Sequence, residues 1–244
     1  MFNFFKKNDL PANDFSHLKT DIHSHLIPGI DDGAKTPEDA IELIRGMHEL
    51  GFKKLITTPH VYQEYYPNTR DSILRGCEQM QKLIKKEGIP VEFSAAAEYY
   101  LEDHFETLLK NKELLTLYDN YVLIEMSSFS PPPKLYDYIF DIRTKGYKPV
   151  LAHPERYSFC AGDFDKFYRL KERGCLFQVN LSSVAGYYDK SVKNTALKLL
   201  KNQLVDFLGT DLHHSRHLEA LNKSVRKKKL SKLIFNQTFL NSEI

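Results

Sequence analysis

Short apolar segments rich in β-branched residues alternate with longer amphipathic segments along most of this chain. Runs of the first kind are typical of buried strands, and apolar residues spaced three and four apart are typical of helices packed on a sheet. The pattern predicts seven strands, at Lys19–His23, Lys54–Thr58, Val91–Ala97, Tyr121–Met126, Pro149–His153, Leu176–Asn180 and Val205–Gly209. It predicts helices over Pro37–Leu50, Asp71–Lys86, Leu135–Lys145, Asp163–Arg173 and Lys190–Lys201.

The first of these helices has the clearest ends. Thr36 is a suitable N-cap, Pro37 fits the first helical position, and Gly51 is a typical stop. Repeated alternation of strand and helix predicts an α/β fold with a parallel sheet, and at this length a closed or nearly closed barrel. An open doubly wound sheet is the alternative, because periodicity alone does not separate the two.

Residues of metal-ligand type stand at or just after most of the predicted strands. These are His23 and His25 with the following Asp31-Asp32-Gly33 loop, then His60, Glu98, Glu125, His153, and Asp211 with His213. The carboxyl ends of all strands meet at one mouth of a barrel, whereas an open sheet spreads them along an edge. The recurrence of such residues therefore favours a barrel.

The chemistry of these residues suits divalent cations. His23 and His25 are two apart in an extended segment, so both rings point to the same side. Imidazole nitrogens and carboxylate oxygens together are typical ligands of transition metals. Each residue taken alone has an ordinary structural interpretation, and the aspartates before Gly33 are typical of a turn. Glu98 and Glu125, however, follow apolar runs in which an unpaired charge would be costly.

Composition excludes several other classes of protein. The net charge of +2 provides no global electrostatic surface for nucleic acid. The three cysteines form no CxxC pair, none is followed six residues later by arginine, and neither a GxSxG elbow nor a P-loop is present. We find no signal peptide and no apolar run near the roughly 18 residues of a membrane span. We therefore expect one cytoplasmic domain over residues 1–244, with metal-activated water as its chemistry.

With these residues assembled, the chain resembles the polymerase and histidinol phosphatase (PHP) superfamily, and in particular the tyrosine-phosphatase branch of bacterial capsule and exopolysaccharide operons. The resemblance covers about residues 19–216, through the segments DIHSHLIPGIDDG, TPH, AAEYY, LIEM, LAHPER and GTDLH. It implies a distorted (β/α)7 barrel of PHP type with the metal cluster at the C-terminal ends of the strands.

The resemblance also implies three divalent ions, Mn²⁺ first, with Fe, Co, Zn or Mg as alternatives. One ion would take His23, His25, Glu98 and Asp211; a second would share Glu98 and take Glu125 and His153; the third would take Asp32, His60 and His213. About six positive charges against about four carboxylates leave a centre that attracts phosphate and acidifies a bridging water. We therefore expect a metal-bound hydroxide to attack phosphorus.

Three residues are expected to take part in catalysis: His153, Arg156 and Arg216. Either arginine can clamp phosphate oxygens, although a surface salt bridge is the alternative for both. Tyr62, Tyr65 and Tyr66 can stack on a phosphotyrosine ring or simply cover the barrel. From about residue 224 the chain has a basic run and an amphipathic segment, interpreted as a final helix or tail or as a docking site for a partner.

The leading functional hypothesis is a protein-tyrosine phosphatase acting on the tail of a bacterial tyrosine kinase that regulates capsule or exopolysaccharide synthesis. Its rivals are a phosphoesterase for a small substrate such as histidinol phosphate and a metal-binding regulatory module without turnover. A nuclease is disfavoured by the near-neutral charge.

Overall fold

The structure is a computed structural model that describes residues 14–225, 233–234 and 237–244. Its strands are β1 (Thr20–Asp21), β2 (Lys54–Thr57), β3 (His60–Val61), β4 (Glu92–Ala95), β5 (Glu98–Tyr100), β6 (Tyr121–Glu125), β7 (Lys148–Ala152), β8 (Leu176–Asn180) and β9 (Phe207–Gly209). Its α-helices are α1 (Pro37–Glu49), α2 (Arg70–Lys86), α3 (Asp103–Asn111), α4 (Leu135–Thr144), α5 (Ser158–Ala161), α6 (Asp165–Glu172), α7 (Leu181–Ala185), α8 (Lys190–Lys201) and α9 (Ser215–Val225). Two 3₁₀ turns complete these elements, η1 (Pro154–Arg156) and η2 (Leu240–Glu243).

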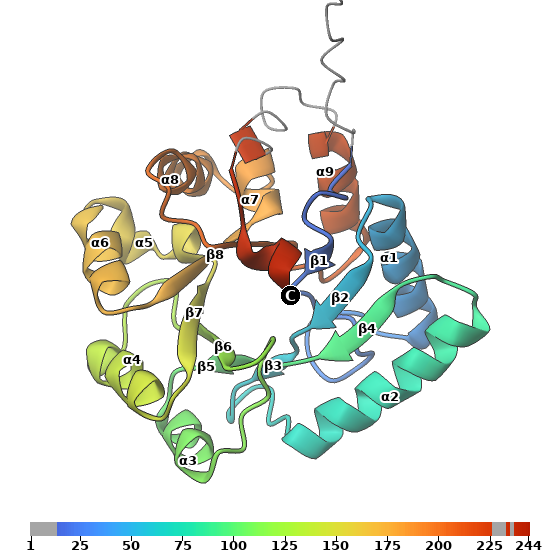
Figure 1. Cartoon of the computed structure of the whole chain (residues 1–244), viewed down its shortest axis with the longest axis horizontal. Helices are drawn as coiled ribbons and strands as arrows, with labels where there is room; N and C mark the ends of the chain where they lie inside the picture. The colour runs from blue at the N-terminus through green and yellow to red at the C-terminus, as the bar shows by residue number, and fades with distance from the viewer. Residues whose placement is uncertain (1–13, 226–232, 235–236) are drawn as a thin grey trace, which may run out of the picture.

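The strands surround a central axis and the helices lie outside them (Figure 1). All pairs are parallel, in a three-stranded sheet β1-β2-β4 and a six-stranded sheet β3-β5-β6-β7-β8-β9. The predicted strands Lys54–Thr58 and Val91–Ala97 correspond to β2 and β4, and each is followed at once by a short strand that was not predicted, β3 and β5, in the other sheet. Proline has no N–H to donate, and Pro59 stands between β2 and β3.

The two sheets are joined on both sides. On one side the chain itself passes from β2 into β3 and from β4 into β5. On the other side backbone hydrogen bonds connect them: Ser24 and Leu212 form a parallel bridge, and Asp211 N donates to His23 O (2.8 Å). The expected distorted (β/α)7 barrel is thus confirmed, with two sheets in place of one continuous ladder, and the open doubly wound sheet is not the fold.

The core has two parts that follow from the alternation of side chains along each strand. One cluster fills the barrel interior and takes side chains from strands around the ring: Ile22, Ile56, Ala96, Leu117, Leu123, Val150, Ala152 and Phe207. The larger cluster lies between strands and helices. Helix α1 contributes Ala40, Leu43, Ile44 and Met47 to it, the spacing of a single helical face.

The predicted helices agree with the structure to within two residues at each end. Helix α1 begins as expected, with a capping box between Thr36 and Asp39 and with Pro37 in its first turn. Helices α3, α5, α7 and α9 were not predicted. Helix α3 has nine residues, buries only Phe105 and Leu109, and has Glu102 as an N-cap without a side-chain hydrogen bond, so its local sequence signal is weak.

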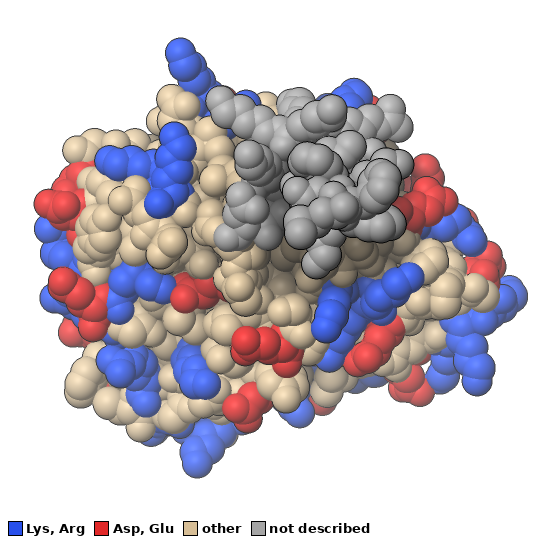
Figure 2. All heavy atoms as spheres, turned by 45° about the horizontal axis from the view of Figure 1, so that its top comes forward, with Lys and Arg blue, Asp and Glu red and all other residues tan. Residues whose placement is uncertain are grey.

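The described surface carries charges of both signs. Figure 2 shows lysine and arginine side chains interspersed with aspartate and glutamate on one face. Among the described residues, no helix is both long and apolar enough to cross a membrane. The basic run at 226–229 lies outside the described residues.

The C-terminus closes the barrel at the centre of the view in Figure 1. The Asn241 side chain is fully buried; its Oδ1 accepts from Leu208 N (2.9 Å), and its Nδ2 donates to Leu208 O (2.6 Å) and Thr20 O (2.9 Å). One amide thus joins β1 to β9, which make no ladder with each other. The expected core ended near residue 216, and the structure extends it because these backbone groups need partners.

We predict that Asn241→Ala lowers the free energy of unfolding by about 2–4 kcal/mol, because three buried backbone groups lose their partner. Urea denaturation measures the change. Glu243→Ala, at an exposed position two residues away, is the control and should leave the denaturation midpoint unchanged. Equal midpoints for both variants and the parent protein would contradict this account of the closure.

Candidate metal centre

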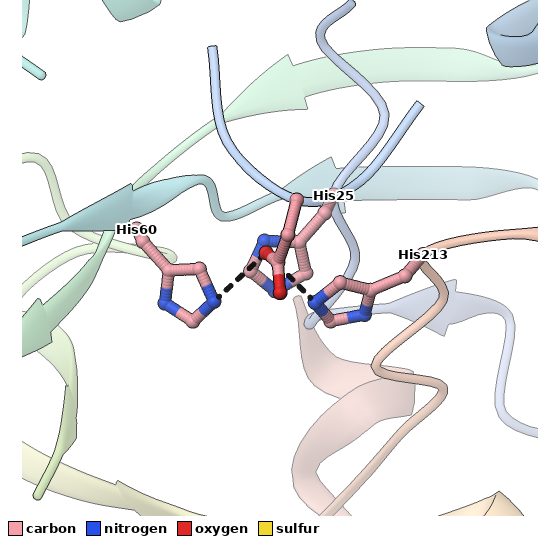
Figure 3. Close-up of side chains that lie close together, drawn as sticks. His25, His60 and His213 are labelled. Carbon is pink, nitrogen blue, oxygen red and sulfur yellow. Dashed lines mark ion pairs between the residues drawn. The ribbon is translucent and has the colours of Figure 1, made fainter. Parts of the chain in front are cut away.

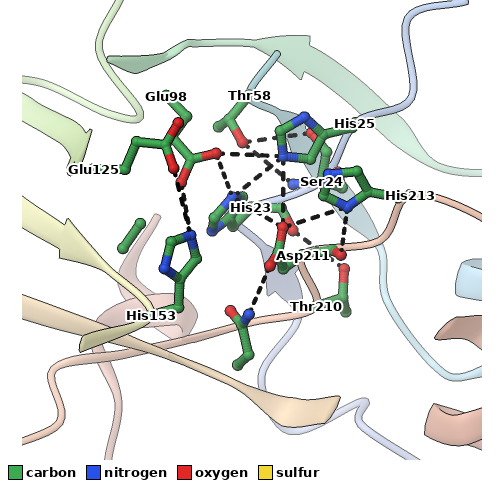
Figure 4. Close-up of polar contacts among 12 residues, drawn as sticks. His23, Ser24, His25, Thr58, Glu98, Glu125, His153, Thr210, Asp211 and His213 are labelled. Carbon is green, nitrogen blue, oxygen red and sulfur yellow. Dashed lines mark hydrogen bonds and ion pairs between the residues drawn. The ribbon is translucent and has the colours of Figure 1, made fainter. Parts of the chain in front are cut away.

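The candidate ligands converge at the carboxyl ends of the strands (Figure 4). Groups of donor atoms close enough to share an ion are His25, Asp32, His60 and His213; His23, Glu98 and His153; His23, His25 and Asp211; and His60, Glu98 and Glu125. These groups share members, so they form one connected centre. All nine residues expected to bind metal belong to it.

The tightest part of the centre has four donors facing one point. His23 Nε2 and His25 Nε2 are 3.4 Å apart. Glu98 Oε2 lies 3.1 Å from the first nitrogen and 3.4 Å from the second, and Asp211 Oδ1 lies 3.4 and 3.5 Å from them. Two ligand atoms bound to one ion at about 2.0–2.1 Å stand at most about 4.2 Å apart. The two ring nitrogens lie within this range of each other and of both carboxylate oxygens, as ligands of a common ion would.

The hydrogen bonds on the far side of each ring support the same conclusion. His25 Nδ1 faces Asp31 Oδ2 at 2.8 Å, and His23 Nδ1 faces Gln178 Oε1 at 2.7 Å. Both partners are acceptors, so in each neutral ring Nδ1 carries the proton and Nε2 presents a lone pair. Two nitrogen lone pairs and two carboxylate oxygens then face one another in a buried site, with no N–H or O–H group between them. A cation satisfies all four.

Glu98 connects this group to the second part of the centre. Its Oε1 lies 3.0 Å from His153 Nε2, and its Oε2 lies 3.2 Å from His60 Nδ1. Glu125 reaches the same region, with Oε1 2.8 Å from His60 Nδ1 and Oε2 3.9 Å from His153 Nε2. Glu98 therefore contacts both parts of the centre, and Glu125 approaches the second part and lines the cavity.

The third part lies at the outer edge of the centre. Figure 3 shows the rings of His60, His25 and His213 around a common point. Asp32 Oδ1 lies 3.4 Å from His60 Nε2 and 3.4 Å from His213 Nε2. The two loop aspartates therefore differ in role: Asp32 faces this point, whereas Asp31 holds His25 from behind.

Electrostatics keep the buried carboxylates ionised. Burial alone would raise the pKa of Glu98, but the His23 and His60 rings hold it well below its usual range. Burial likewise raises the pKa of Asp211, but His23 and His213 outweigh it and lower this pKa well below its usual range. Both carboxylates are thus ready to bind a cation.

Two candidate ligands have a left-handed backbone conformation, His153 with φ of 36° and Asp211 with φ of 51°. Non-glycine residues rarely adopt this region, and such conformations often occur at functional sites. At both strand ends the turn directs a side chain into the centre.

A cavity of about 370 Å³ opens onto these residues. Arg156 lines it, donates from Nη1 to Asp211 Oδ2 (3.0 Å), and lies 5.0 Å from the ring of Tyr188. Arg216 is exposed on α9 and does not line this cavity, so its role as a phosphate clamp stays a prediction.

The tyrosine-rich loop after β3 lies beside the centre. Tyr66 stacks on His60 with ring centroids 5.3 Å apart, Tyr62 stacks on Tyr100 at 4.1 Å, and Tyr65 is exposed. These contacts place Tyr66 nearest to the candidate ligands.

Three residues around the centre were not predicted to have a role. Gln178 and Asn180 are fully buried on β8, and Tyr188 lines the cavity. Gln178 and Asn180 are polar residues at alternate positions of an otherwise apolar strand, and this pattern could have indicated that both side chains point to one side.

A parallel barrel with a histidine–carboxylate centre at its strand ends defines a protein of the PHP type. A family profile described as "Capsular polysaccharide synthesis, CpsB/CapC" matches residues 19–241. The chain belongs to this CpsB/CapC family.

Several relatives are characterised or solved proteins. The tyrosine-protein phosphatase YwqE of Bacillus subtilis is 33% identical over 195 residues, which cover 80% of this chain and 77% of YwqE. The tyrosine-protein phosphatase CpsB of Streptococcus pneumoniae is 29% identical over 201 residues, with 80% and 82% covered.

Solved structures show the same relationship. A chain from the crystal structures of YwqE from Bacillus subtilis and CpsB from Streptococcus pneumoniae, described as unique metal-dependent tyrosine phosphatases, superposes with a TM-score of 0.78 at 30% identity, covering 90% of this chain and 96% of that one. Histidinol phosphate phosphatase from Lactococcus lactis shares the fold at a TM-score of 0.50 and 10% identity, with 86% and 92% covered.

We predict that Mn²⁺ stabilises the protein more at pH 8.5 than at pH 6. Burial lowers the pKa of His25, but Asp31 and the neighbouring carboxylates outweigh it and raise this pKa well above the usual value in the metal-free protein. A raised histidine pKa contributes stability below about pH 6.5 that is lost as the pH rises through the folded value. A metal ion must displace the same proton, so its binding has the opposite pH dependence.

Thermal unfolding with and without Mn²⁺ at the two pH values measures this difference. Mg²⁺ at low concentration, which binds imidazole poorly, serves as the control. An equal shift in the unfolding temperature at both pH values would show that cation binding is not coupled to these protons.

Proposed function

We propose that this chain is a metal-dependent protein-tyrosine phosphatase. The observation that carries the proposal is a buried set of imidazole nitrogens and carboxylate oxygens, which opens into a cavity lined by one arginine. YwqE and CpsB, both named tyrosine-protein phosphatases, support the choice of substrate.

We further propose three divalent ions, Mn²⁺ first, held by the nine residues of the centre. His23, His25, Glu98 and Asp211 would hold the first, Glu98, Glu125 and His153 the second, and Asp32, His60 and His213 the third. When bound, such ions acidify water and neutralise charge on phosphate oxygens. Mixed nitrogen and oxygen ligands accept several metals, so availability contributes to the choice.

Arg156 is assigned to the phosphate. Its Nη1 is bound to Asp211, and its remaining N–H groups are available to the cavity, where the side chain is about one-third exposed (33%). Asp211 and the ring of Tyr188 fix the plane of the guanidinium, so its donors can meet two phosphate oxygens together. In this role Arg156 binds and orients the phosphate while it is displaced from tyrosine.

The loop containing Tyr62, Tyr65 and Tyr66 is proposed to receive the aromatic ring. Tyr66 stacks on His60, which is a candidate ligand, so this tyrosine lies next to the metal centre. A substrate phosphotyrosine could stack on it while its phosphate reaches the centre. Tyrosine has a reference pKa of about 10 and is a comparatively good leaving group. The required assistance from a protein acid is correspondingly small.

We propose that the physiological substrate is the phosphorylated tail of a bacterial tyrosine kinase that controls capsule or exopolysaccharide synthesis. The family description supports the link to capsular polysaccharide. Cys77, Cys160 and Cys175 are free and buried, which suits the reducing cytoplasm as the site of action.

We predict that Arg156→Ala lowers kcat/KM for a phosphotyrosine peptide by about 10²–10³, because one preorganised charge on the phosphate is lost. The kcat/KM of Arg156→Lys should lie between those of the parent protein and Arg156→Ala, since lysine keeps the charge and loses the planar fork. Bound metal, measured by elemental analysis, should be unchanged because Asn180 still donates to Asp211. Metal loss in the alanine variant would instead make Arg156 a support of Asp211.

The substrate class is tested with the Mn²⁺-reconstituted protein on four substrates in parallel: a phosphotyrosine peptide, a phosphoserine peptide, histidinol phosphate and single-stranded DNA. Preference for the phosphotyrosine peptide is the expected result. Preference for histidinol phosphate or DNA overturns the proposal. Inactivity on all four with metal bound identifies a non-catalytic metal-binding module.

A further inference from the structure

Two polar side chains on β8 are buried in the barrel beside the candidate ligands without belonging to them. Gln178 and Asn180 are both fully buried and two residues apart, so they point to the same side of the strand. Strand β8 lies between β7, which His153 follows, and β9, which leads to Asp211. The two amides therefore lie beside the centre, and neither lines the cavity.

A chain of three hydrogen bonds runs through these amides from one candidate ligand to another. His23 Nδ1 lies 2.7 Å from Gln178 Oε1. Gln178 Nε2 donates to Asn180 Oδ1 (2.9 Å), and Asn180 Nδ2 donates to Asp211 Oδ2 (2.7 Å). His23 Nε2 and Asp211 Oδ1, at the two ends of the chain, face the same cation position 3.4 Å apart.

The direction of every bond in this chain follows from the ionised end. A carboxylate accepts only, so Asn180 must present its NH₂ group to Asp211 and its oxygen to Gln178. Gln178 must then donate with its own NH₂ group and turn its oxygen to His23. The ring of His23 is thereby required to carry its proton on Nδ1, which leaves the Nε2 lone pair for the ion.

The backbone makes room for this arrangement. Gly209 on β9 lies beside Gln178, and a Cβ atom at this position would stand 2.6 Å from Gln178 Nε2 and 2.9 Å from His23 Cβ. Real Cβ atoms do not approach other atoms this closely. The absence of a side chain at residue 209 thus allows Gln178 to reach the ring.

We propose that Gln178 and Asn180 are positioning residues that set the affinity of the first cation position, by fixing the tautomer of His23 and the orientation of Asp211 together. This inference rests on the metal centre of the proposed function. Neither residue contacts the substrate cavity. The amides act only through the two ligands that they hold.

The test is the affinity of the protein for Mn²⁺, measured by competition with a chelator, in Gln178→Met. Methionine keeps the length and volume of glutamine and removes both hydrogen bonds. Loss of an outer partner of a ligand typically weakens metal binding about 10- to 100-fold, and we expect a loss in this range at one position. Turnover should fall at limiting Mn²⁺ and recover when Mn²⁺ is saturating.

Two further variants complete the experiment. Gln178→Asn keeps a buried amide that is one methylene too short to span both bonds, so it should fold and show a smaller loss of affinity. Gln81→Met makes the same change on α2, where Gln81 Nε2 donates to Phe93 O, and should bind Mn²⁺ like the parent protein.

The Co²⁺-substituted protein provides a readout that a merely structural role would not move. Its visible absorption reports ligand geometry, and the bands of Gln178→Met should change while the bands of Gln81→Met should not. Parental Mn²⁺ affinity and parental Co²⁺ bands in both Gln178 variants overturn the proposal. Because these readouts do not require turnover, they remain decisive even if the protein is not a tyrosine phosphatase.

Discussion

The structure depends on one fully buried carboxylate, that of Glu98, which lies just beyond the carboxyl end of β4 and is the first residue of β5. An isolated charge at such a position would be strongly unfavourable, so its surroundings must supply positive charge or hydrogen bonds. The rings of His23, His60 and His153 approach it at 3.0–3.2 Å from three other strand ends. A closed arrangement of parallel strands allows this, because it directs separate strand ends toward one point.

The ends of the barrel divide the tasks of stability and chemistry. At the amino end of the strands the C-terminal segment covers the interior, and Asn241 joins β1 to β9 where no ladder forms. At the carboxyl end, the ring nitrogens and carboxylate oxygens of the candidate ligands face inward and are left free to bind a cation. Left-handed backbone at His153 and Asp211 occurs at this second end, where strained conformations direct side chains into the centre.

The elements were predictable where the local pattern was strong. Seven barrel strands and five amphipathic helices follow from periodicity, and helix α1 was predicted at its first residue because its cap and proline are local signals. The short strands β3 and β5 and the short helix α3 were not predicted, since they depend on packing rather than on a repeated pattern. The contribution of residues 239–244 to the core depends on contacts with β1 and β9, more than thirty residues distant in the chain.

The sequence by itself determined which residue types stand at the strand ends, and hence that histidines and carboxylates would meet at one mouth of a parallel barrel. Only the tertiary structure decided which nitrogen of each ring faces the ion, because the deciding partner is Asp31 for His25 and Gln178 for His23. It also distinguished Asp31 from Asp32, which are equivalent in a turn pattern and face opposite sides of His25 in space. The physical reason is that periodicity shows which face of a strand or helix a side chain lies on, whereas a hydrogen bond depends on how two such elements pack against each other.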